Sequence, residues 1–315
     1  MTFDTPTLDL LERVRTAGRK PFSACTAVEA RAFPTLMKSL FGEGLPVARV
    51  QDLALPTPEG HPLPARLYVP EACNGDLIVY FHGGGWVLGS VADHDPFTAT
   101  LAARTHAAVL SVDYRLAPES PHPGPVDDAI AALQQGGQAG AAWLGQPLRR
   151  LIAMGDSAGA TLATVGTRRL RELPGARPVD LQVLVYPVTD AGFDTASYRD
   201  FAQGHLLSAD DMRWFWDHYC PDTAARRHPD ASPLQATDLA GLPPARIFTA
   251  ECDPLRDEGE AYGERLTAAG VDCETVRCPG LLHAFLSMIH GSPNAARAFE
   301  GIVQSLAMQD GEQRA

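Results

Sequence analysis

The sequence predicts an α/β fold with a mostly parallel central sheet flanked by helices. From residue 77 onward, short apolar runs alternate with helix-like stretches, and this alternation is typical of parallel strands joined by crossover helices. In addition, the polar motifs of the chain follow directly after apolar runs. Those positions are the carboxyl ends of the predicted strands, where the sites of parallel sheets collect.

The elements follow from apolar periodicity and from the turn residues between them. The strands are predicted at residues 47–55, 65–69, 77–81, 108–112, 151–154, 181–186, 246–250 and 273–276. The helices are predicted at residues 7–16, 27–41, 96–105, 125–135, 158–171, 209–219, 257–269 and 294–308. The helix at 209–219 is expected to begin at Ser208, because Asp210 and Asp211 follow it.

A Gly-x-Ser-x-Gly pentapeptide occupies residues 155–159, between a predicted strand and a predicted helix. In that context the pattern predicts a nucleophile elbow, with Ser157 as the nucleophile. Gly155 and Gly159 have no Cβ, so the backbones of the strand and the helix can approach closely. The helix that follows supplies free backbone N–H groups near the serine oxygen.

His82-Gly83-Gly84-Gly85-Trp86 follows the strand predicted at 77–81. Three glycines in a row allow backbone N–H groups to face a substrate, as an oxyanion hole requires. An oxyanion hole beside a nucleophile elbow also uses the N–H of the residue after the nucleophile, here Ala158. A dinucleotide-binding loop is disfavoured because the sixth position counted from Gly83 is Leu88 rather than glycine.

The acid and the base should follow the serine in the chain order serine, acid, histidine. Asp253 comes just after the strand at 246–250 and is favoured over Glu251, which would point to the other side of an extended chain from Cys252. Asp257 and Glu258 fit the first turn of the next helix, where they complement its dipole. Of ten histidines, His283 has the right position, on the loop after the last strand, and it would act as the general base.

These motifs together resemble the bacterial hormone-sensitive-lipase-like esterases, a branch of the α/β-hydrolase superfamily. The resemblance runs from about residue 45 to the C-terminus and rests on five segments in one order. They are His82 to Trp86, Asp113-Tyr114-Arg115-Leu116-Ala117-Pro118-Glu119, Gly155 to Gly159, Asp253-Pro254-Leu255-Arg256-Asp257-Glu258 and His283-Ala284-Phe285.

The resemblance implies an α/β-hydrolase fold with a helical cap and ester hydrolysis through an acyl-enzyme. It implies Ser157, Asp253 and His283 as the catalytic triad. Gly83, Gly84 and Ala158 would be the oxyanion donors, with the choice of two among the three glycines left open. It also implies that His82 braces the loop.

The family's cap suggests an organisation into segments. Residues 1–45 would be N-terminal cap helices, 46–188 and 245–315 the catalytic core, and 189–244 a cap insertion. Apolar side chains of the cap are then expected to contact the acyl group. The candidates for substrate binding are Leu206 and Trp214 of the cap insertion and Trp86 of the catalytic core.

The function expected is a serine carboxylesterase for short- to medium-chain acyl esters. Amide hydrolysis, as by a formamidase, is an alternative because the same triad serves it. A ligand-binding protein on this scaffold is disfavoured by the intact serine, aspartate and histidine. Relatives often dimerise through an edge strand, so a homodimer through residues 273–276 is expected by analogy.

The bulk composition fits an ordinary globular protein of 315 residues, with 45% hydrophobic and 20% charged residues. A net charge of −12 argues against nucleic acid and anionic membranes as partners. Neither a signal peptide nor a long apolar run is evident, so a cytoplasmic location is expected. The six cysteines match no usual zinc spacing, so reduced thiols, no metal and no cofactor are expected. Cys252 is of interest because it adjoins Asp253.

Overall fold

One eight-stranded sheet forms the centre of the structure, a computed structural model that describes residues 3–16, 18, 20–32 and 42–307. The strand order is β1-β2-β4-β3-β5-β6-β7-β8. β2 runs antiparallel to both of its neighbours, and the remaining pairs are parallel. The predicted mostly parallel α/β fold is therefore confirmed.

The strands are β1 (Arg49–Pro56), β2 (Pro62–Val69), β3 (Leu77–Phe81), β4 (Ala108–Val112), β5 (Leu151–Asp156), β6 (Leu181–Val185), β7 (Ala245–Cys252) and β8 (Cys273–Leu282). The longer helices are α1 (Thr5–Thr16), α4 (Val91–Thr105), α5 (Gly124–Leu144), α6 (Ala158–Leu170), α8 (Ala209–Tyr219), α9 (Arg256–Ala268) and α10 (Pro293–Ala307). The short helical segments are η1 (Phe22–Ala24), α2 (Ala27–Ala30), α7 (Ala196–Asp200), η2 (Ala225–Arg227), η3 (Pro233–Gln235) and η4 (Phe285–Met288).

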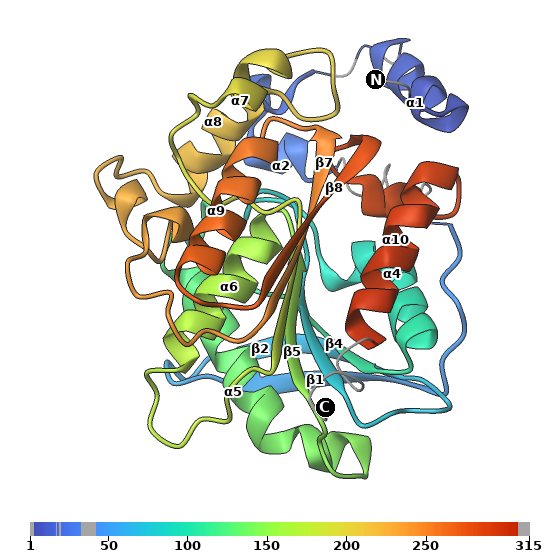
Figure 1. Cartoon of the computed structure of the whole chain (residues 1–315), viewed down its shortest axis with the longest axis vertical. Coiled ribbons are helices and arrows are strands. Elements are labelled where there is room, and N and C mark those ends of the chain that lie inside the picture. The colour runs from blue at the N-terminus through green and yellow to red at the C-terminus, as the bar shows by residue number, and fades with distance from the viewer. Residues whose placement is uncertain (1–2, 17, 19, 33–41, 308–315) are drawn as a thin grey trace.

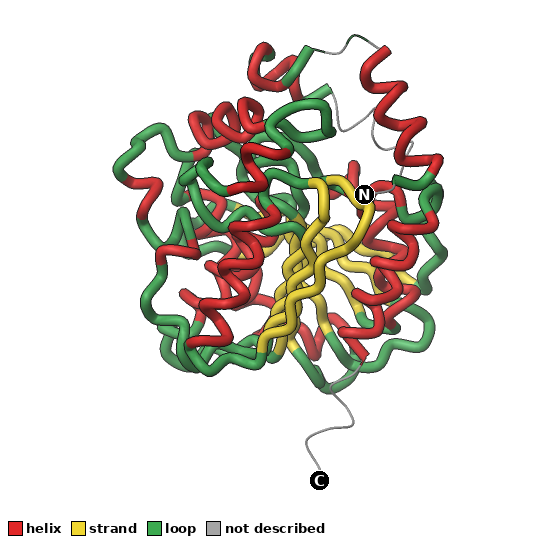
Figure 2. Tube along the Cα trace, turned by 45° about the horizontal axis from the view of Figure 1, so that its top comes forward, coloured by secondary structure: helices red, strands yellow, loops and turns green. Residues whose placement is uncertain are grey.

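Helices cover both faces of the sheet. α4 and α10 pack on one face, and α5, α6 and α9 pack on the other (Figure 1). The same two helical layers flank the twisted strands when the molecule is tilted forward (Figure 2). Because both faces are covered, every residue of β3, β4, β5 and β6 is buried, as expected for parallel strands.

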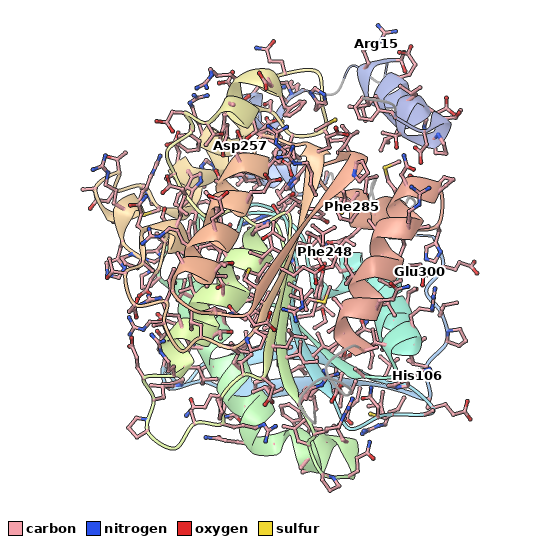
Figure 3. All side chains as sticks on the ribbon, viewed as in Figure 1. Arg15, His106, Phe248, Asp257, Phe285 and Glu300 are labelled. Atoms are coloured by element: carbon pink, nitrogen blue, oxygen red, sulfur yellow. The ribbon has the colours of Figure 1, made fainter. Side chains whose placement is uncertain are left out.

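Apolar side chains fill the space between the sheet and its helices. On the α10 side, Phe248 of β7 and Phe285 belong to one buried cluster with Phe299. Figure 3 shows Phe248 and Phe285 within the molecule and Arg15 and Glu300 at its surface. None of the described helices is both long enough and apolar enough to cross a membrane.

Several helices begin or end elsewhere than predicted. α5 continues to Leu144, well beyond the predicted end at residue 135. α4 begins at Val91 instead of residue 96, because the Ser90 side chain accepts a hydrogen bond from the N–H of Asp93 and caps the helix. Pro96 thus lies inside the helix. The helix predicted at 27–41 is described only as α2, and residues 33–41 lie outside the described residues.

Residues 189–244 leave the sheet between β6 and β7. This segment contains α7 and α8, and α8 spans the predicted residues and begins with a capping box of Ser208 and Asp211. α8 packs against η1. Together with α2 these elements lie at the top of the view in Figure 1, above the carboxyl ends of the parallel strands.

Candidate active site

Ser157 occupies the sharp turn between β5 and α6. Its φ of 53° and ψ of −122° are unusual for a residue with a side chain. The turn is so tight that neither flanking glycine has room for a Cβ. A Cβ on Gly155 would lie 2.3 Å from the backbone of Gly159, and one on Gly159 would lie 2.0 Å from the carbonyl oxygen of Phe81. The steric reason predicted for the two glycines is thus present in the structure.

Ser157, Asp253 and His283 meet in one hydrogen-bonded chain. His283 Nδ1 lies 2.7 Å from Asp253 Oδ2, and His283 Nε2 lies 2.9 Å from Ser157 Oγ. All three residues are buried. Since the carboxylate can only accept, Nδ1 carries the hydrogen and Nε2 is left to accept from the serine hydroxyl. This arrangement can remove a proton from Ser157 and return it to a leaving group.

Each alternative acid has a different partner. The Glu251 carboxylate accepts a hydrogen bond from the N–H of Gly280 at 2.7 Å. Asp257 accepts from the N–H of Ser197, and Glu258 accepts from the N–H of Thr189. Burial raises the pKa of Glu258 well above its usual range. Asp257 and Glu258 therefore hold the segment after β6 on α9, in addition to lying in the helix's first turn as predicted.

The structure corrects one expectation about the oxyanion loop, which is formed by residues 83–85. The N–H of Gly83 donates to Asp156 Oδ1 at 2.8 Å, so it is not available to a substrate. In the described part of the chain, the N–H groups of Gly84 and Gly85 have no acceptor, and both glycines line the cavity beside Ser157. Their φ angles of 121° and 59° suit glycine. Gly84 and Gly85, with Ala158 at the first position of α6, are therefore the groups able to receive an oxyanion.

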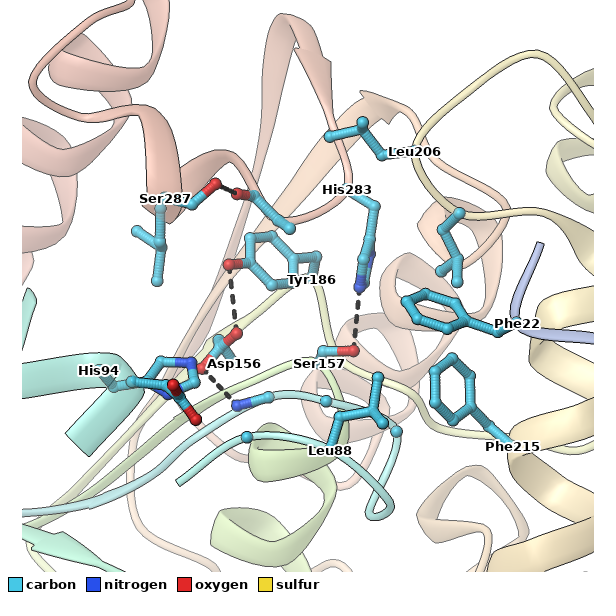
Figure 4. Close-up of a pocket in the computed structure, with 18 of the residues that line it drawn as sticks. Phe22, Leu88, His94, Asp156, Ser157, Tyr186, Leu206, Phe215, His283 and Ser287 are labelled. Carbon is cyan, nitrogen blue, oxygen red and sulfur yellow. Dashed lines mark hydrogen bonds between the residues drawn. The ribbon is translucent and has the colours of Figure 1, made fainter. Parts of the chain in front are cut away.

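A cavity of about 150 Å³ lies over Ser157 and has two chemically different sides (Figure 4). The apolar side is formed by Phe22, Leu88, Leu206, Leu207, Met212 and Phe215. The polar side is formed by Tyr80, Asp93, His94, Asp156, Tyr186 and Ser287. In Figure 4, Phe22 and Phe215 lie on one flank of the Ser157–His283 hydrogen bond, and Asp156, Tyr186 and His94 lie on the other.

Of the three side chains predicted to bind substrate, Leu206 lines the cavity, and Trp86 and Trp214 do not. Trp86 is fully buried and stacks on Tyr219, with ring centroids 4.0 Å apart and planes 9° apart. Trp214 donates its Nε1–H to the carbonyl oxygen of Cys25. Trp214 is directed away because it lies on a different face of α8 from the residues that reach the cavity.

The predicted substrate-binding residues do not include Phe22, Met212 and Phe215, which line the cavity. Met212 and Phe215 are three residues apart on α8, and that spacing puts both on one helix face. Helical periodicity within 209–219 could therefore have selected them. Phe22 gives no such signal, because its contact with Phe215, at a ring distance of 5.3 Å, joins segments far apart in the chain.

His82 has the bracing position that the resemblance implied. Its Nδ1 donates to the carbonyl oxygen of Gly83 at 2.7 Å, and its ring stacks on Tyr114 with centroids 4.4 Å apart. Complete burial lowers the pKa of His82 to about 3. His82 is therefore neutral at ordinary pH.

No group of three or more metal-binding side chains occurs within the described ranges. All six cysteines are free. Cys252 is fully buried, and burial raises the pKa of its thiol to about 11, so it stays protonated and unreactive.

Comparisons with known proteins show what this chain is similar to. A family model described as alpha/beta hydrolase fold matches residues 78–287. The chain is 39% identical over 290 residues to an ethyl acetate hydrolase of Pseudomonas putida, covering 89% of this chain and 90% of that protein. It is 39% identical over 283 residues to the carboxylesterase NlhH of Mycobacterium tuberculosis, covering 88% of each.

Solved structures extend the similarity to the whole fold. A hyperthermophilic esterase from the archaeon Pyrobaculum calidifontis superposes with a TM-score of 0.89 at 35% sequence identity. The superposition covers 97% of this chain and 98% of that chain.

Proposed function

Because this chain belongs to the hormone-sensitive-lipase-like esterases of the α/β-hydrolase superfamily and is a carboxylesterase, we propose that it hydrolyses short- to medium-chain acyl esters through an acyl-enzyme on Ser157. The observation that carries the proposal is the hydrogen-bonded chain from Asp253 through His283 to Ser157 at the floor of a small cavity.

The proposed reaction begins with attack of Ser157 Oγ on the ester carbonyl carbon as His283 Nε2 takes the serine proton. Asp253 holds the imidazole and stabilises its charged form. The N–H groups of Gly84, Gly85 and Ala158 receive the negative carbonyl oxygen. The tetrahedral intermediate then collapses, His283 gives its proton to the leaving alcohol, and water releases the acid by the same steps.

The apolar side of the cavity supports the substrate class. Phe22, Met212 and Phe215 would enclose an uncharged acyl group and exclude water from it. The small cavity favours short chains, as does the similarity to an ethyl acetate hydrolase. In this proposal, residues 1–45 and 189–244 form a cap, because these two segments supply five of the six apolar lining residues, all except Leu88.

The proposal is tested with p-nitrophenyl esters of increasing chain length and with Ser157→Ala. We expect turnover to peak at short or medium chains and to fall by about 10⁴-fold or more in the variant. Ser111→Ala is the matched control, because Ser111 is a fully buried serine of β4 whose hydroxyl has no partner among the described residues.

Ser157→Ala retaining near wild-type turnover would reject the triad. The corresponding p-nitroanilides separate ester from amide hydrolysis, because the triad could serve both. Faster turnover of the anilides than of the matched esters would reject an ester as the preferred substrate.

We also propose a homodimer through β8. β8 is an edge of the sheet and pairs only with β7 in the described part of the chain. Its outer backbone groups could pair with the same strand of a second copy. The molecular mass in solution, measured by light scattering, tests this arrangement.

A further inference from the structure

Asp156, the residue before the nucleophile, takes no part in the proposed reaction, yet its carboxylate is buried beside the cavity. Three hydrogen bonds converge on it. Tyr80 Oη and the N–H of Gly83 donate to Oδ1 at 2.6 and 2.8 Å, and Tyr186 Oη donates to Oδ2 at 3.3 Å. A carboxylate buried in this way depends on its hydrogen-bond donors for stabilisation.

The hydrogen bond from the N–H of Gly83 to Asp156 fixes the oxyanion loop. The Asp156 carboxylate lies so close beneath the loop that a Cβ on Gly83 would come within 2.4 Å of Oδ2. The bond to Asp156 orients the Gly83 peptide toward the core. The next two N–H groups, of Gly84 and Gly85, have no acceptor among the described residues and line the cavity. Asp156 thus holds the first amide of the loop on the side away from the substrate.

The hydrogen bond from Tyr186 to Asp156 links the carboxylate to the general base, His283. Tyr186 follows β6 with a φ of 36°, and its N–H donates to the carbonyl oxygen of Phe248 at 2.6 Å. Its ring lies 4.7 Å, centroid to centroid, from the ring of His283. Figure 4 shows Tyr186 between Asp156 and His283. The carboxylate that orients the oxyanion loop therefore also anchors the ring packed on the imidazole.

We propose that Asp156 is a positioning residue for ester hydrolysis, which aligns the oxyanion N–H groups of the glycine loop through its hydrogen bond to Gly83. The role requires a hydrogen-bond acceptor at Oδ1, not a negative charge. This inference rests on the proposed function, because it assumes that Ser157 and the loop act on the same ester carbonyl.

Three substitutions separate the acceptor from the charge and from packing. Asp156→Ala removes the carboxylate, and Asp156→Leu keeps a branched side chain of similar size but cannot accept. Asp156→Asn keeps an oxygen at Oδ1, and its amide can donate to the Tyr186 hydroxyl. We expect kcat to fall about 10- to 100-fold in the first two variants, with KM within about twofold. Asp156→Asn should remain within about threefold of wild type.

A trifluoromethyl ketone gives a readout that a purely structural role would not change. Ser157 Oγ adds to its carbonyl carbon, the serine proton passes to His283, and the carbonyl electron pair becomes an oxyanion in the hole. Its inhibition constant should rise in parallel with the loss of kcat/KM in Asp156→Ala and Asp156→Leu. Inhibition by the matching methyl carbinol, which forms no oxyanion, should not change.

Asp76→Ala is the control for the loss of a buried aspartate. Asp76 lies just before β3, at the opposite end of that strand from the loop, and it accepts hydrogen bonds from Arg149 and Arg150. Its loss should lower the melting temperature and leave kcat per active site unchanged.

The outcomes discriminate between the possibilities. Wild-type kcat in folded Asp156→Leu, or an equal loss of kcat in Asp156→Asn and Asp156→Leu, would overturn the positioning role. If Asp156→Ala does not fold, Asp156→Leu decides alone. Absence of ester turnover in the wild-type protein would instead reject the proposed function, so the two failures are distinguishable.

Discussion

His82 illustrates how a single residue next to the site can link stability to pH. It is fully buried between the rings of His94 and Tyr114, at centroid distances of 5.0 and 4.4 Å. Burial lowers its pKa from 6.5 to about 3. Its neutral form is therefore the one compatible with the folded glycine loop, whose Gly83 carbonyl it contacts.

We predict that His82 makes the protein less stable in mild acid. Between pH 6.5 and about pH 3 the unfolded chain binds a proton at His82 that the folded chain does not. Its contribution to stability is therefore complete above pH 6.5 and is lost as the pH falls below it. His82→Phe, which preserves the ring stacking, should reduce the loss in unfolding free energy between pH 7 and pH 5.5 by about 1 kcal/mol. Urea unfolding at the two pH values measures this difference.

The control for this measurement is His106→Asn. His106 is exposed, and its φ of 55° is one that asparagine tolerates. The control variant should show the same dependence on pH as the wild type. An unchanged dependence in His82→Phe as well would mean that His82 is not the group responsible.

At the scale of elements, α8 is packed directly on the oxyanion loop. A Cβ on Gly85 would come 2.1 Å from the ring of Phe215, so that ring lies on the loop backbone itself. The next residue, Trp86, stacks on Tyr219 and contacts Trp216 edge-on at 5.1 Å. The same helix thus encloses the cavity and fixes one end of the loop that lines it.

We therefore predict that Tyr219→Leu lowers kcat as well as stability. Removal of the stacked ring should let Trp86 and the preceding glycines shift, and kcat should fall about 3- to 10-fold with little change in KM. The unfolding free energy should fall by about 1–3 kcal/mol. Tyr219→Phe keeps the stack and loses only the hydroxyl contact with His122 Nδ1 at 3.2 Å.

Steady-state kinetics at fixed concentrations of titrated active sites give the comparison. Tyr219→Phe should retain nearly all of kcat. If Tyr219→Leu loses stability and keeps wild-type kcat, the packing of α8 does not influence the position of the loop.

Element positions were predictable where burial leaves a simple pattern. β3 and β4 match their predicted bounds, because strands covered on both faces are continuous apolar runs. β7 and β8 extend further than predicted, since a register shift allows Cys252 to pair with Leu282. Such pairing depends on a distant partner, and local sequence patterns do not contain it.

The same distinction applies to the site. Ser157, Asp253 and His283 each follow a strand end within a short motif, so their positions could be located from sequence. The replacement of Gly83 by Gly85 as a free donor could not be predicted, because it depends on which amide faces Asp156. Trp86 and Trp214 are aromatic, but packing between segments decides which cavity an aromatic ring faces.

At the scale of the whole molecule, the net charge affects how charged substrates approach the protein. The chain carries 38 acidic and 26 basic residues, a net charge of −12. Asp93 and Asp156 add carboxylates to the polar side of the cavity. A protein of this charge repels anions over about 30 Å at 0.01 M salt and over only about 3 Å at 1 M.

We accordingly predict that the enzyme discriminates against anionic esters in a salt-dependent manner. Phenyl acetate and 4-acetoxybenzoate carry the same acyl group and differ by one carboxylate on the leaving group. For the anionic ester, kcat/KM should rise about three- to tenfold between 0.01 and 1 M sodium chloride, because screening removes the repulsion that slows its approach. For the neutral ester, kcat/KM should stay within about twofold over the same range. Equal salt dependence of the two esters would mean that salt acts on the enzyme itself, and a fall for the anionic ester would indicate a local cationic contact that outweighs the net charge.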